Sequence, residues 1–291
     1  MNKNKSIIGL IMLLVMSVAY VKYHNSEYFH LCRLEASVKN EDYDETKLIL
    51  EQYDFNLNVP VGYANGIVTF LTNKKPMVPL LYACSDSNYA MVRLLINNGA
   101  TANYVEGTET SPLLATLGCY QPNDLLIVRE LLDAGAEINY CVNSIIPIAA
   151  AASMQPEIIT AGSQSELSGV YNERAANEIK DIVDLLLKNG AMSKGDGLGQ
   201  EFNLLNLASK AGNIILIEYL IEHKEYNANA QNSEGKTALF YVEEDTINYC
   251  ATINCLIANG TKKTMQDIYG KKAYDYALES GNLNMAALLR P

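Results

Sequence analysis

Three adjacent carboxylates, Glu243–Asp245, form a cluster whose residue types suit chemistry. Neighbouring carboxylates can bind a hard cation or act as general acid and base. Both uses need further ligands or a base within hydrogen-bond reach, and the sequence has only three histidines, His24, His30 and His223. We therefore interpret the cluster as the solvated or partner-facing edge of a helix, and we predict no catalytic or metal-binding residue.

A second segment with possible chemistry is the glycine-rich stretch Gly197–Gln200, GLGQ. Glycine-rich loops that cradle phosphate follow a strand and open a helix. This segment follows a predicted helix, so we interpret it as the tip of a hairpin. The sequence contains no P-loop, dinucleotide fingerprint, H-E-x-x-H or G-x-S-x-G pattern. We predict a non-enzymatic protein without a cofactor.

The charge balance of the chain limits the kinds of partner. Hydrophobic residues make up 49% and charged residues 19%, which is typical of a chain that folds around a core. The formal net charge is −11 at pH 7, and no cluster of Lys and Arg forms the basic face that nucleic-acid binding needs. A cationic protein partner suits this balance. The alternative is that the acidity only keeps the protein soluble.

The N-terminal residues read as a targeting or membrane segment. Lys3 and Lys5 precede an uncharged run of 16 residues, Ser6–Val21, which is short for a membrane span and long for a signal-peptide core. Two interpretations of residues 1–23 stay open: a signal peptide cleaved after Ala19, or an anchor with its first lysines in the cytoplasm. Both place the remaining chain in a periplasm or on the periplasmic face of an inner membrane.

Six short blocks recur from residue 76 onward at nearly one spacing. They read VPLLYA, SPLLAT, IPIAAA, NLLNLA, TALFYV and KAYDYA. Pro79, Pro112 and Pro147 mark the first three blocks and are 33 and 35 residues apart. Leu204 in the fourth block lies 57 residues beyond Pro147, and we assign the excess to an insertion at 153–176. A period of this length indicates stacked structural repeats.

Each repeat has the residues of two helices. Proline in the first turn of a helix removes no hydrogen bond. The second helix carries an apolar stripe, such as Val128 and Leu131, and Gly135 then allows the left-handed conformation that ends it. Asn139 and Asn229 start the turn toward the next repeat. One helix pair cannot bury its stripe alone, so neighbouring pairs must stack.

These blocks resemble the ankyrin repeat family, whose pattern is about 33 residues long with a T-P-L-H-x-A helix start. The helix ends NNGATAN, DAGAEIN, KNGA and EYNANA also match. The resemblance implies an all-α solenoid of stacked helix–turn–helix units with short β-hairpin fingers, preceded here by an N-terminal hydrophobic helix. One departure stands out: the family's histidine is absent from every block, so other groups must hold the helix starts.

The predicted domain organisation follows from the repeats. Residues 1–23 are the signal peptide or anchor, residues 24–75 are a capping repeat and a connection, and residues 76–291 are the ankyrin repeats. The predicted repeat boundaries are about 76–109, 110–142, 143–201 with the insertion, 202–234, 235–267 and 268–291.

The cysteines suggest a disulfide rather than a metal site. The sequence has six cysteines and no C-x-x-C pair, so we predict no zinc site. Export permits disulfides. Cys119 and Cys141 flank one predicted helix pair, and we predict a bridge between them. Cys84 occupies a small-residue helix position, where a buried thiol is common.

The resemblance places partner binding on the concave side, formed by the fingers and the inner helix faces. Carried over by position, the predicted partner-binding residues are Lys75, Met77, Asp86, Thr108, Thr110, Asn143, Ile145, Gln200, Phe202, Glu234, Lys236, Glu244, Asp245 and Tyr269. Met77, Ile145, Phe202 and Tyr269 are apolar where exposure is expected, as in a binding hot spot. The alternative is that they pack between neighbouring fingers.

We expect a monomeric, non-enzymatic protein-binding module outside the cytoplasm, with membrane contact only through an uncleaved N-terminal helix. The expected partner is another, basic protein rather than a nucleic acid. An immunity protein that blocks a bacterial toxin fits this description, because an acidic surface can fill a basic substrate cleft. One alternative is a general envelope scaffold or accessory protein. The other is an enzyme with an unrecognised site in the insertion at 153–176.

Overall fold

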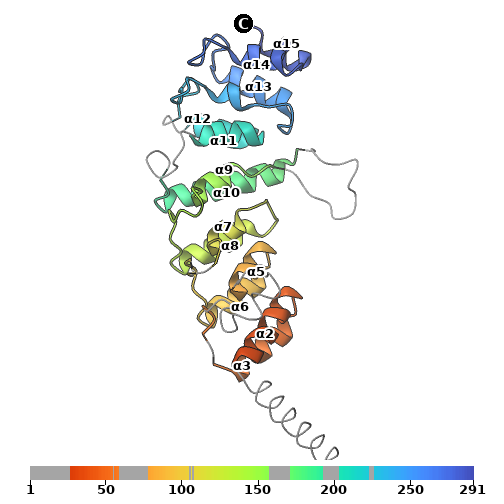
Figure 1. Ribbon diagram of the computed structural model, residues 1–291, viewed down its shortest axis with the longest axis vertical. Helices are drawn as coiled ribbons and strands as arrows, with labels where there is room; N and C mark the ends of the chain where they lie inside the picture. The colour runs from red at the N-terminus through yellow and green to blue at the C-terminus, as the bar shows by residue number, and fades with distance from the viewer. Residues whose placement is uncertain are drawn as a thin grey trace, which may run out of the picture. The chain divides into compact units, whose positions relative to one another are not determined.

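The computed structural model describes residues 27–54, 56–58, 78–104, 106, 108–156, 171–192, 203–222 and 226–291 (Figure 1). Four predicted partner-binding residues, Lys75, Met77, Gln200 and Phe202, lie outside these ranges, as do the N-terminal residues 1–23. None of the helices within the described ranges combines the length and apolar character that crossing a membrane requires.

The chain divides into two compact units, Met1–Thr110 and Ser111–Pro291. The first predicted repeat, residues 76–109, therefore groups with the capping residues rather than with the repeats that follow. The helices described in the first unit are α2 (Glu27–Lys39), α3 (Tyr43–Gln52), α5 (Pro79–Ser85) and α6 (Tyr89–Asn97). Helix α2 packs on α3 and α5, and α6 packs on α5 and α3, so two helix pairs stack.

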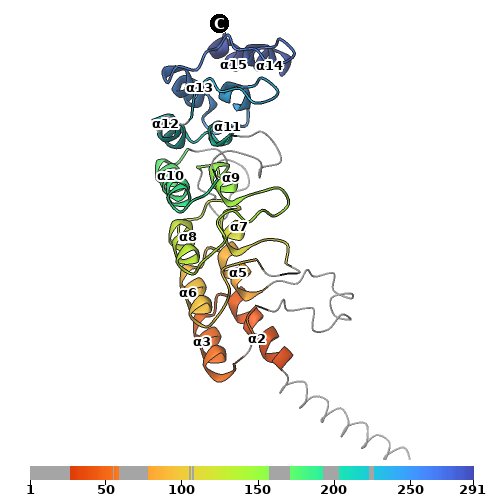
Figure 2. The ribbon, with the colours of Figure 1, turned by 90° about the vertical axis from the view of Figure 1, so that its left-hand side faces the viewer.

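The second unit repeats the same arrangement five times. Its helices are α7 (Pro112–Thr116), α8 (Asp124–Asp133), α9 (Pro147–Ala152), α10 (Glu173–Lys188), α11 (Leu204–Ala211), α12 (Ile214–Glu222), the 3₁₀ helix η1 (Ala238–Tyr241), α13 (Tyr249–Ala258), α14 (Ala273–Glu279) and α15 (Leu283–Leu289). The inner row is α7, α9, α11, η1 and α14, and the outer row is α8, α10, α12, α13 and α15 (Figure 2). Each element packs on its pair and on its neighbours in the row.

The core of the second unit lies between the two rows. The outer-row side chains that face it are fully buried: Ile127, Leu131, Ile182, Leu186, Leu216, Leu220, Ile253 and Leu256. Their spacing within each helix is the apolar stripe that predicted stacking. The predicted all-α class of stacked helix pairs is confirmed over the described residues, where the one bridge with both partners described joins Val142 and Ile145.

At α7, α11 and α14, short polar side chains hold the helix start in place of the family's histidine. The Asn203 Oδ1 accepts the N–H of Asn206 at 2.8 Å, and the Asp275 Oδ2 accepts the N–H of Lys272 at 2.7 Å. Ser111 caps α7 in the same way. These bonds satisfy helix-terminal donors that would otherwise lack partners.

At two turns, one asparagine bonds to the repeat that follows the turn. The Asn139 Nδ2 donates to the carbonyl of Gly190 at 3.1 Å, and the Asn139 Oδ1 accepts the N–H of Met192 at 2.9 Å. Asn229 makes the equivalent pair of bonds to Gly260 and Lys262, at 2.9 and 2.7 Å. The side chains predicted to start a turn therefore also bridge consecutive repeats.

The insertion in the third repeat is shorter than predicted. Helix α10 begins at Glu173, inside the predicted insertion 153–176, because the Asn172 side chain accepts the N–H of Ala175 at 3.0 Å and caps it there. The N–H of Asn172 also donates to the carbonyl of Pro156 at 2.7 Å, so the two ends of the insertion meet. Residues 157–170 lie outside the described ranges.

The inner element of the fifth repeat differs most from the prediction. A helix was expected through Glu244 and Asp245, but only the four-residue η1 forms, and both carboxylates lie in the turn that follows it. Aromatic and β-branched residues in FYV have low helix propensity. The Thr246 Oγ1 also accepts the N–H of Glu243 at 2.8 Å, which satisfies that donor outside a helix. The inner row is therefore short at this position.

Candidate functional site

Two fingers project from the last junctions of the second unit, residues 232–236 and 267–271. Each is closed by a backbone bond, from the N–H of Asn232 to the carbonyl of Lys236 at 3.0 Å and from the N–H of Asp267 to the carbonyl of Lys271 at 2.9 Å. The N–H of Ile268 donates to the carbonyl of Glu234 at 2.9 Å and joins the fingers. They therefore form one continuous surface, which we call the finger pair.

The tips of the fingers expose apolar side chains. Ile268 is 62% exposed and Tyr269 is 73% exposed. On the earlier hairpin at Asn143 and Ser144, Ile145 is 49% exposed. The predicted exposure of Ile145 and Tyr269 is confirmed, and the alternative that they pack between fingers is wrong. Large apolar groups in such positions are available to a partner.

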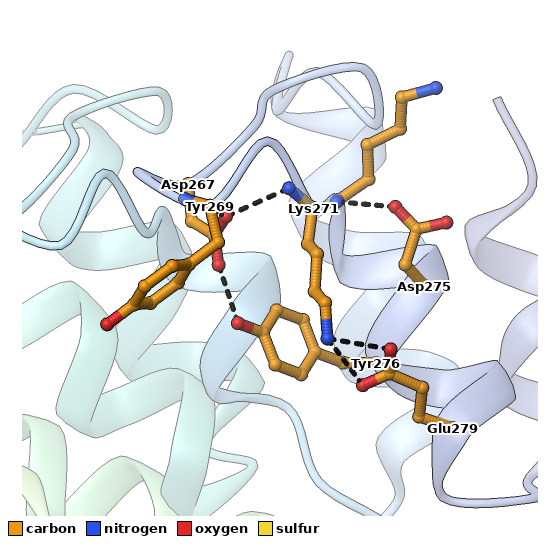
Figure 3. Close-up of polar contacts among 7 residues, drawn as sticks. Asp267, Tyr269, Lys271, Asp275, Tyr276 and Glu279 are labelled. Carbon is orange, nitrogen blue, oxygen red and sulfur yellow. Dashed lines mark hydrogen bonds and ion pairs between the residues drawn. The ribbon is translucent and has the colours of Figure 1, made fainter.

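Asp267 organises the second finger (Figure 3). Its Oδ1 accepts the N–H groups of Tyr269 and Lys271, each at 2.9 Å, and its Oδ2 accepts the hydroxyl of Tyr276 at 2.6 Å. Burial would raise the pKa of the Asp267 carboxyl, but these three hydrogen bonds favour its charged form and lower the pKa below the ordinary value. The hydrogen bond from the Tyr276 hydroxyl to Asp267 raises the pKa of Tyr276.

Both lysines beside Tyr276 are held by carboxylates of the same chain. The Lys271 Nζ pairs with Glu279 at 2.7 Å, and the Lys236 Nζ pairs with Glu234 at 2.7 Å. The two ammonium groups lie 5.3 and 5.7 Å from the centre of the Tyr276 ring. These positive charges are therefore already compensated within the site, and Figure 3 shows the pair of Lys271 and Glu279.

We expect the Asp267→Asn variant to lose less stability in acid than the wild type. A carboxyl whose folded-state pKa is lowered stabilises the fold above its unfolded pKa of about 3.9, and this contribution is lost as the pH falls through the folded pKa. The preceding finger shows that asparagine fits, because the Asn232 Oδ1 accepts the N–H of Lys236 and its Nδ2 donates to the Tyr241 hydroxyl.

The measurement is the urea midpoint of both proteins between pH 6 and pH 2. The other carboxylates titrate equally in the two proteins, so the difference between the curves reports this position. Parallel curves down to pH 2 would show that Asp267 carries no acid-sensitive stability. Asp267→Ala, which leaves the two finger N–H groups without their acceptor, is the disruptive reference.

A groove of about 750 Å³ opens beside the finger pair. It lies against η1, the turn after it, α14 and α15, and we call it the η1–α14 groove. Its lining residues are Lys236, Leu239, Phe240, Val242, Glu243, Glu244, Asp245, Ala273, Tyr276, Ala277, Ser280 and Met285. Leu239, Ala273, Ala277 and Met285 are buried and give it an apolar floor. Phe240 packs edge-on against Tyr276, with ring centres 6.0 Å apart.

The charged groups around the groove leave an excess of negative charge. Glu243 pairs with Lys210 at 3.4 Å. Glu244 and Asp245 are exposed on the rim, and neither forms an ion pair within the part of the chain that the structure describes. Because Lys210, Lys236 and Lys271 each have a carboxylate partner, Glu244 and Asp245 are the carboxylates left for a ligand.

A family model described as "Ankyrin repeats (3 copies)" matches residues 205–291, which include the finger pair and the groove. These residues are therefore ankyrin repeats. The putative ankyrin repeat protein R664 of Acanthamoeba polyphaga mimivirus is 33% identical over 73 residues, 24% of this chain and 45% of that protein. The match therefore spans less than half the length of this curated relative.

Solved ankyrin structures share the fold. The human ASB11 ankyrin repeat domain is 18% identical with a TM-score of 0.61, covering 89% of this chain and 97% of that chain. The Bcl-3 ankyrin repeat domain is 16% identical with a TM-score of 0.55, covering 89% and 98%. The ankyrin repeat protein EF0377 is 23% identical with a TM-score of 0.50, covering 72% and 95%. Ankyrin repeats are protein–protein interaction modules and are generally non-enzymatic.

The predicted partner-binding residues of the ankyrin repeats fall into separate places. Lys236, Glu244 and Asp245 line the groove, and Glu234 and Tyr269 lie on the finger pair beside it. Asn143 and Ile145 are exposed on another hairpin of the second unit, and Asp86 is exposed after α5 in the first unit. Thr110 is half-buried. The structure thus gathers five of the predicted residues at one site.

Thr108 is a correction to the predicted surface. It is only 6% exposed, so it is not available to a partner. Its hydroxyl donates to the carbonyl of Thr110 at 3.1 Å, and its own carbonyl accepts the Tyr104 hydroxyl at 3.0 Å. The side chain therefore holds its own loop together instead of facing outward.

The predicted bridge between Cys119 and Cys141 is also absent. Both residues are free thiols with exposed side chains. Cys119 precedes α8 and Cys141 lies beyond its far end, and the ten residues of α8 span about 15 Å. A disulfide needs Cα atoms within about 7 Å, so the intervening helix separates the thiols.

Asp267, Tyr276 and the apolar floor of the groove were not among the residues predicted from the sequence. A signal for the first two was present, because Asn232 and Tyr241 occupy the same positions one repeat earlier, at an offset of 35 residues. Within the described ranges, no three His, Cys, Asp or Glu side chains gather in a way that would hold a metal ion. The absence of a cofactor stays a prediction.

Proposed function

We propose that the chain is a non-enzymatic binding module that acts outside the cytoplasm by covering a cationic surface of a partner protein. The observation that carries this proposal is that two kinds of group lie on neighbouring surfaces. Ile268 and Tyr269 are exposed on the finger pair, and Glu244 and Asp245, which form no ion pair within the described residues, lie on the rim of the groove beside it. Apolar anchors surrounded by complementary charge are the usual composition of an affinity hot spot and its rim.

The proposed partner is a toxin, and the chain is its immunity protein. A net charge of −11 attracts a basic protein over a distance, which raises the association rate at low salt. An inhibitor of this kind needs no catalytic group, because occupying the toxin's substrate cleft is sufficient. The paired lysines of the finger pair limit repulsion of a basic partner.

The proposed location rests on the sequence of residues 1–23, whose uncharged run follows two lysines. A reporter enzyme that is active only outside the cytoplasm, fused after Pro291, tests it. Activity of this fusion supports export or anchoring with the repeats outside. A fusion that works only with a cytoplasmic reporter contradicts the proposed location.

We expect co-expression of the full chain to relieve the growth arrest caused by a toxin encoded beside it, and the double variant Ile268→Ser/Tyr269→Ser to fail. Loss of two exposed anchors weakens binding by more than about tenfold when they are hot-spot residues. Growth curves and the dissociation constant of the purified pair are the measurements.

The matched control is Leu283→Ser. Leu283 is 71% exposed, like Tyr269, but it follows the turn at the opposite end of α14. The Leu283→Ser substitution therefore removes exposed apolar surface without changing the finger pair. Equal loss of protection in both variants, or protection by neither the wild type nor the control, contradicts the proposed function.

A further inference from the structure

The η1–α14 groove lies at the shortest inner element that the structure describes in the second unit. The inner helices there have five to eight residues, whereas η1 has four. Ala273 and Ala277 of α14 line the groove beside it. Small side chains on α14 deepen the same space.

The floor of the groove suits an apolar side chain. Leu239, Val242 and Met285 surround the two alanines, and all five side chains are buried within the fold while lining the cavity. A volume of about 750 Å³ is within the range of about 300–1,000 Å³ in which drug-sized ligands are enclosed. A short peptide segment has a comparable size.

The rim suits a cation. Glu243 is already paired with Lys210, and Lys236 is paired with Glu234, so these charges cancel. Glu244 and Asp245 remain, side by side and exposed, on the turn after η1. An arginine or lysine lays its methylene stem on apolar surface and keeps its charged head at the solvent edge. In this groove, the methylene stem would contact the apolar floor and the charged head would contact the carboxylates of the rim.

We infer that the η1–α14 groove binds a short peptide segment in which an arginine or lysine is flanked by apolar residues. The cationic head lies against Glu244 and Asp245, and the flanking side chain enters the apolar floor. The inference rests on the proposed function and specifies which chemistry the partner presents. It requires both features together, because an exposed charge pair alone contributes little to affinity.

Met285 gives a direct readout of the groove. Of the nine methionines in the chain, it is the one among the described residues that lines the cavity, so we expect a ¹³C-methyl-methionine spectrum of the full chain to contain one signal from the floor. The Met285→Leu variant assigns that signal. The probes are three blocked pentapeptides: Ala-Leu-Arg-Leu-Ala, the same peptide with Glu in place of Arg, and Ala-Ser-Arg-Ser-Ala.

We expect the Arg–Leu peptide to shift the Met285 signal saturably, and each of the other peptides to need at least about tenfold higher concentration. The Glu peptide faces two like charges on the rim, and the Ser peptide loses two apolar side chains from the floor. The Ser280→Trp variant, which places an indole at an exposed lining position, removes the saturable shift. Unchanged signals from its other methionines show that the variant is folded.

A Met285 signal that responds equally to the Arg and Glu peptides overturns the inference, and so does Arg-peptide binding that leaves Met285 unmoved. The two proposals fail separately. If the Arg peptide shifts the Met285 signal but the chain neutralises no toxin encoded beside it, peptide binding by the groove is supported and the immunity function is contradicted. If the toxin is neutralised while the Arg peptide leaves the Met285 signal unchanged, the immunity function is supported and peptide binding by the groove is contradicted.

Discussion

The Gly235→Ala variant should lower the free energy of unfolding by about 2–4 kcal/mol, whereas Gly270→Ala should cost about 1–2 kcal/mol. Both glycines occupy the same place in consecutive fingers and have nearly the same backbone angle, with φ of 75° and 74°. A side chain is strained in this left-handed region at either position. The difference between the variants therefore comes from what surrounds each glycine.

Gly235 lies directly beneath the next finger. A Cβ atom added there would lie 2.9 Å from the Cα of Asp267 and 3.0 Å from the backbone nitrogen of Ile268. These atoms belong to backbone and cannot rotate away, so the fingers must separate. Separation breaks the bond from the N–H of Ile268 to the carbonyl of Glu234. Gly270 has nothing within 4 Å of its added Cβ, because no described backbone packs on that side of its finger.

Urea unfolding followed by circular dichroism at 222 nm gives the two midpoints. Repeat proteins can unfold in parts, so the comparison should use variants of identical helix content and the initial transition of each curve. Equal destabilisation by the two alanines would mean that backbone conformation alone determines the cost. Greater destabilisation by Gly270→Ala would contradict the packing seen between the fingers.

The sequence predicted the repeats of this protein because local and periodic features specify them. Proline at the first helical turn of α5, α7 and α9, and the recurring apolar stripe, each act within one helix pair. The same positions that mark a repeat also bury its core. Sequence spacing therefore identified every helix pair from α5 to α15, including the pair interrupted by the insertion.

The groove could not be predicted, because it depends on where a helix stops early. The block TALFYV reads as a helix start like the others, and its termination after Tyr241 depends on weak propensities and on the Thr246 hydroxyl. Thr108 was likewise misplaced because a loop hydrogen bond, rather than residue type, decides its burial. Such effects involve contacts within turns that periodicity does not record.

Reversing the charge of the groove rim should reverse its peptide preference. In the double variant Glu244→Lys/Asp245→Lys, we expect the Glu pentapeptide to bind more tightly than the Arg pentapeptide at low salt. Each exposed charge contact contributes about 0.2–1 kcal/mol, so exchanging two attractions and two repulsions changes the affinity of each peptide by about 2 kcal/mol, or roughly 30-fold, in opposite directions. The Met285 methyl titration measures both affinities.

Asp133→Lys/Glu222→Lys is the matched control, because it makes the same change in net charge at exposed C-terminal ends of α8 and α12. If only the overall charge of the protein attracts basic peptides, this control and the rim variant will weaken the Arg peptide equally. If the rim carboxylates act at short range, only the rim variant changes the preference. Added salt separates the contributions further, because a Debye length of about 3 Å at 1 M screens the exposed rim while the contribution of the apolar floor persists. A preference that survives in the rim variant at both salt concentrations would assign the selectivity to the floor of the groove and exclude Glu244 and Asp245 from recognition.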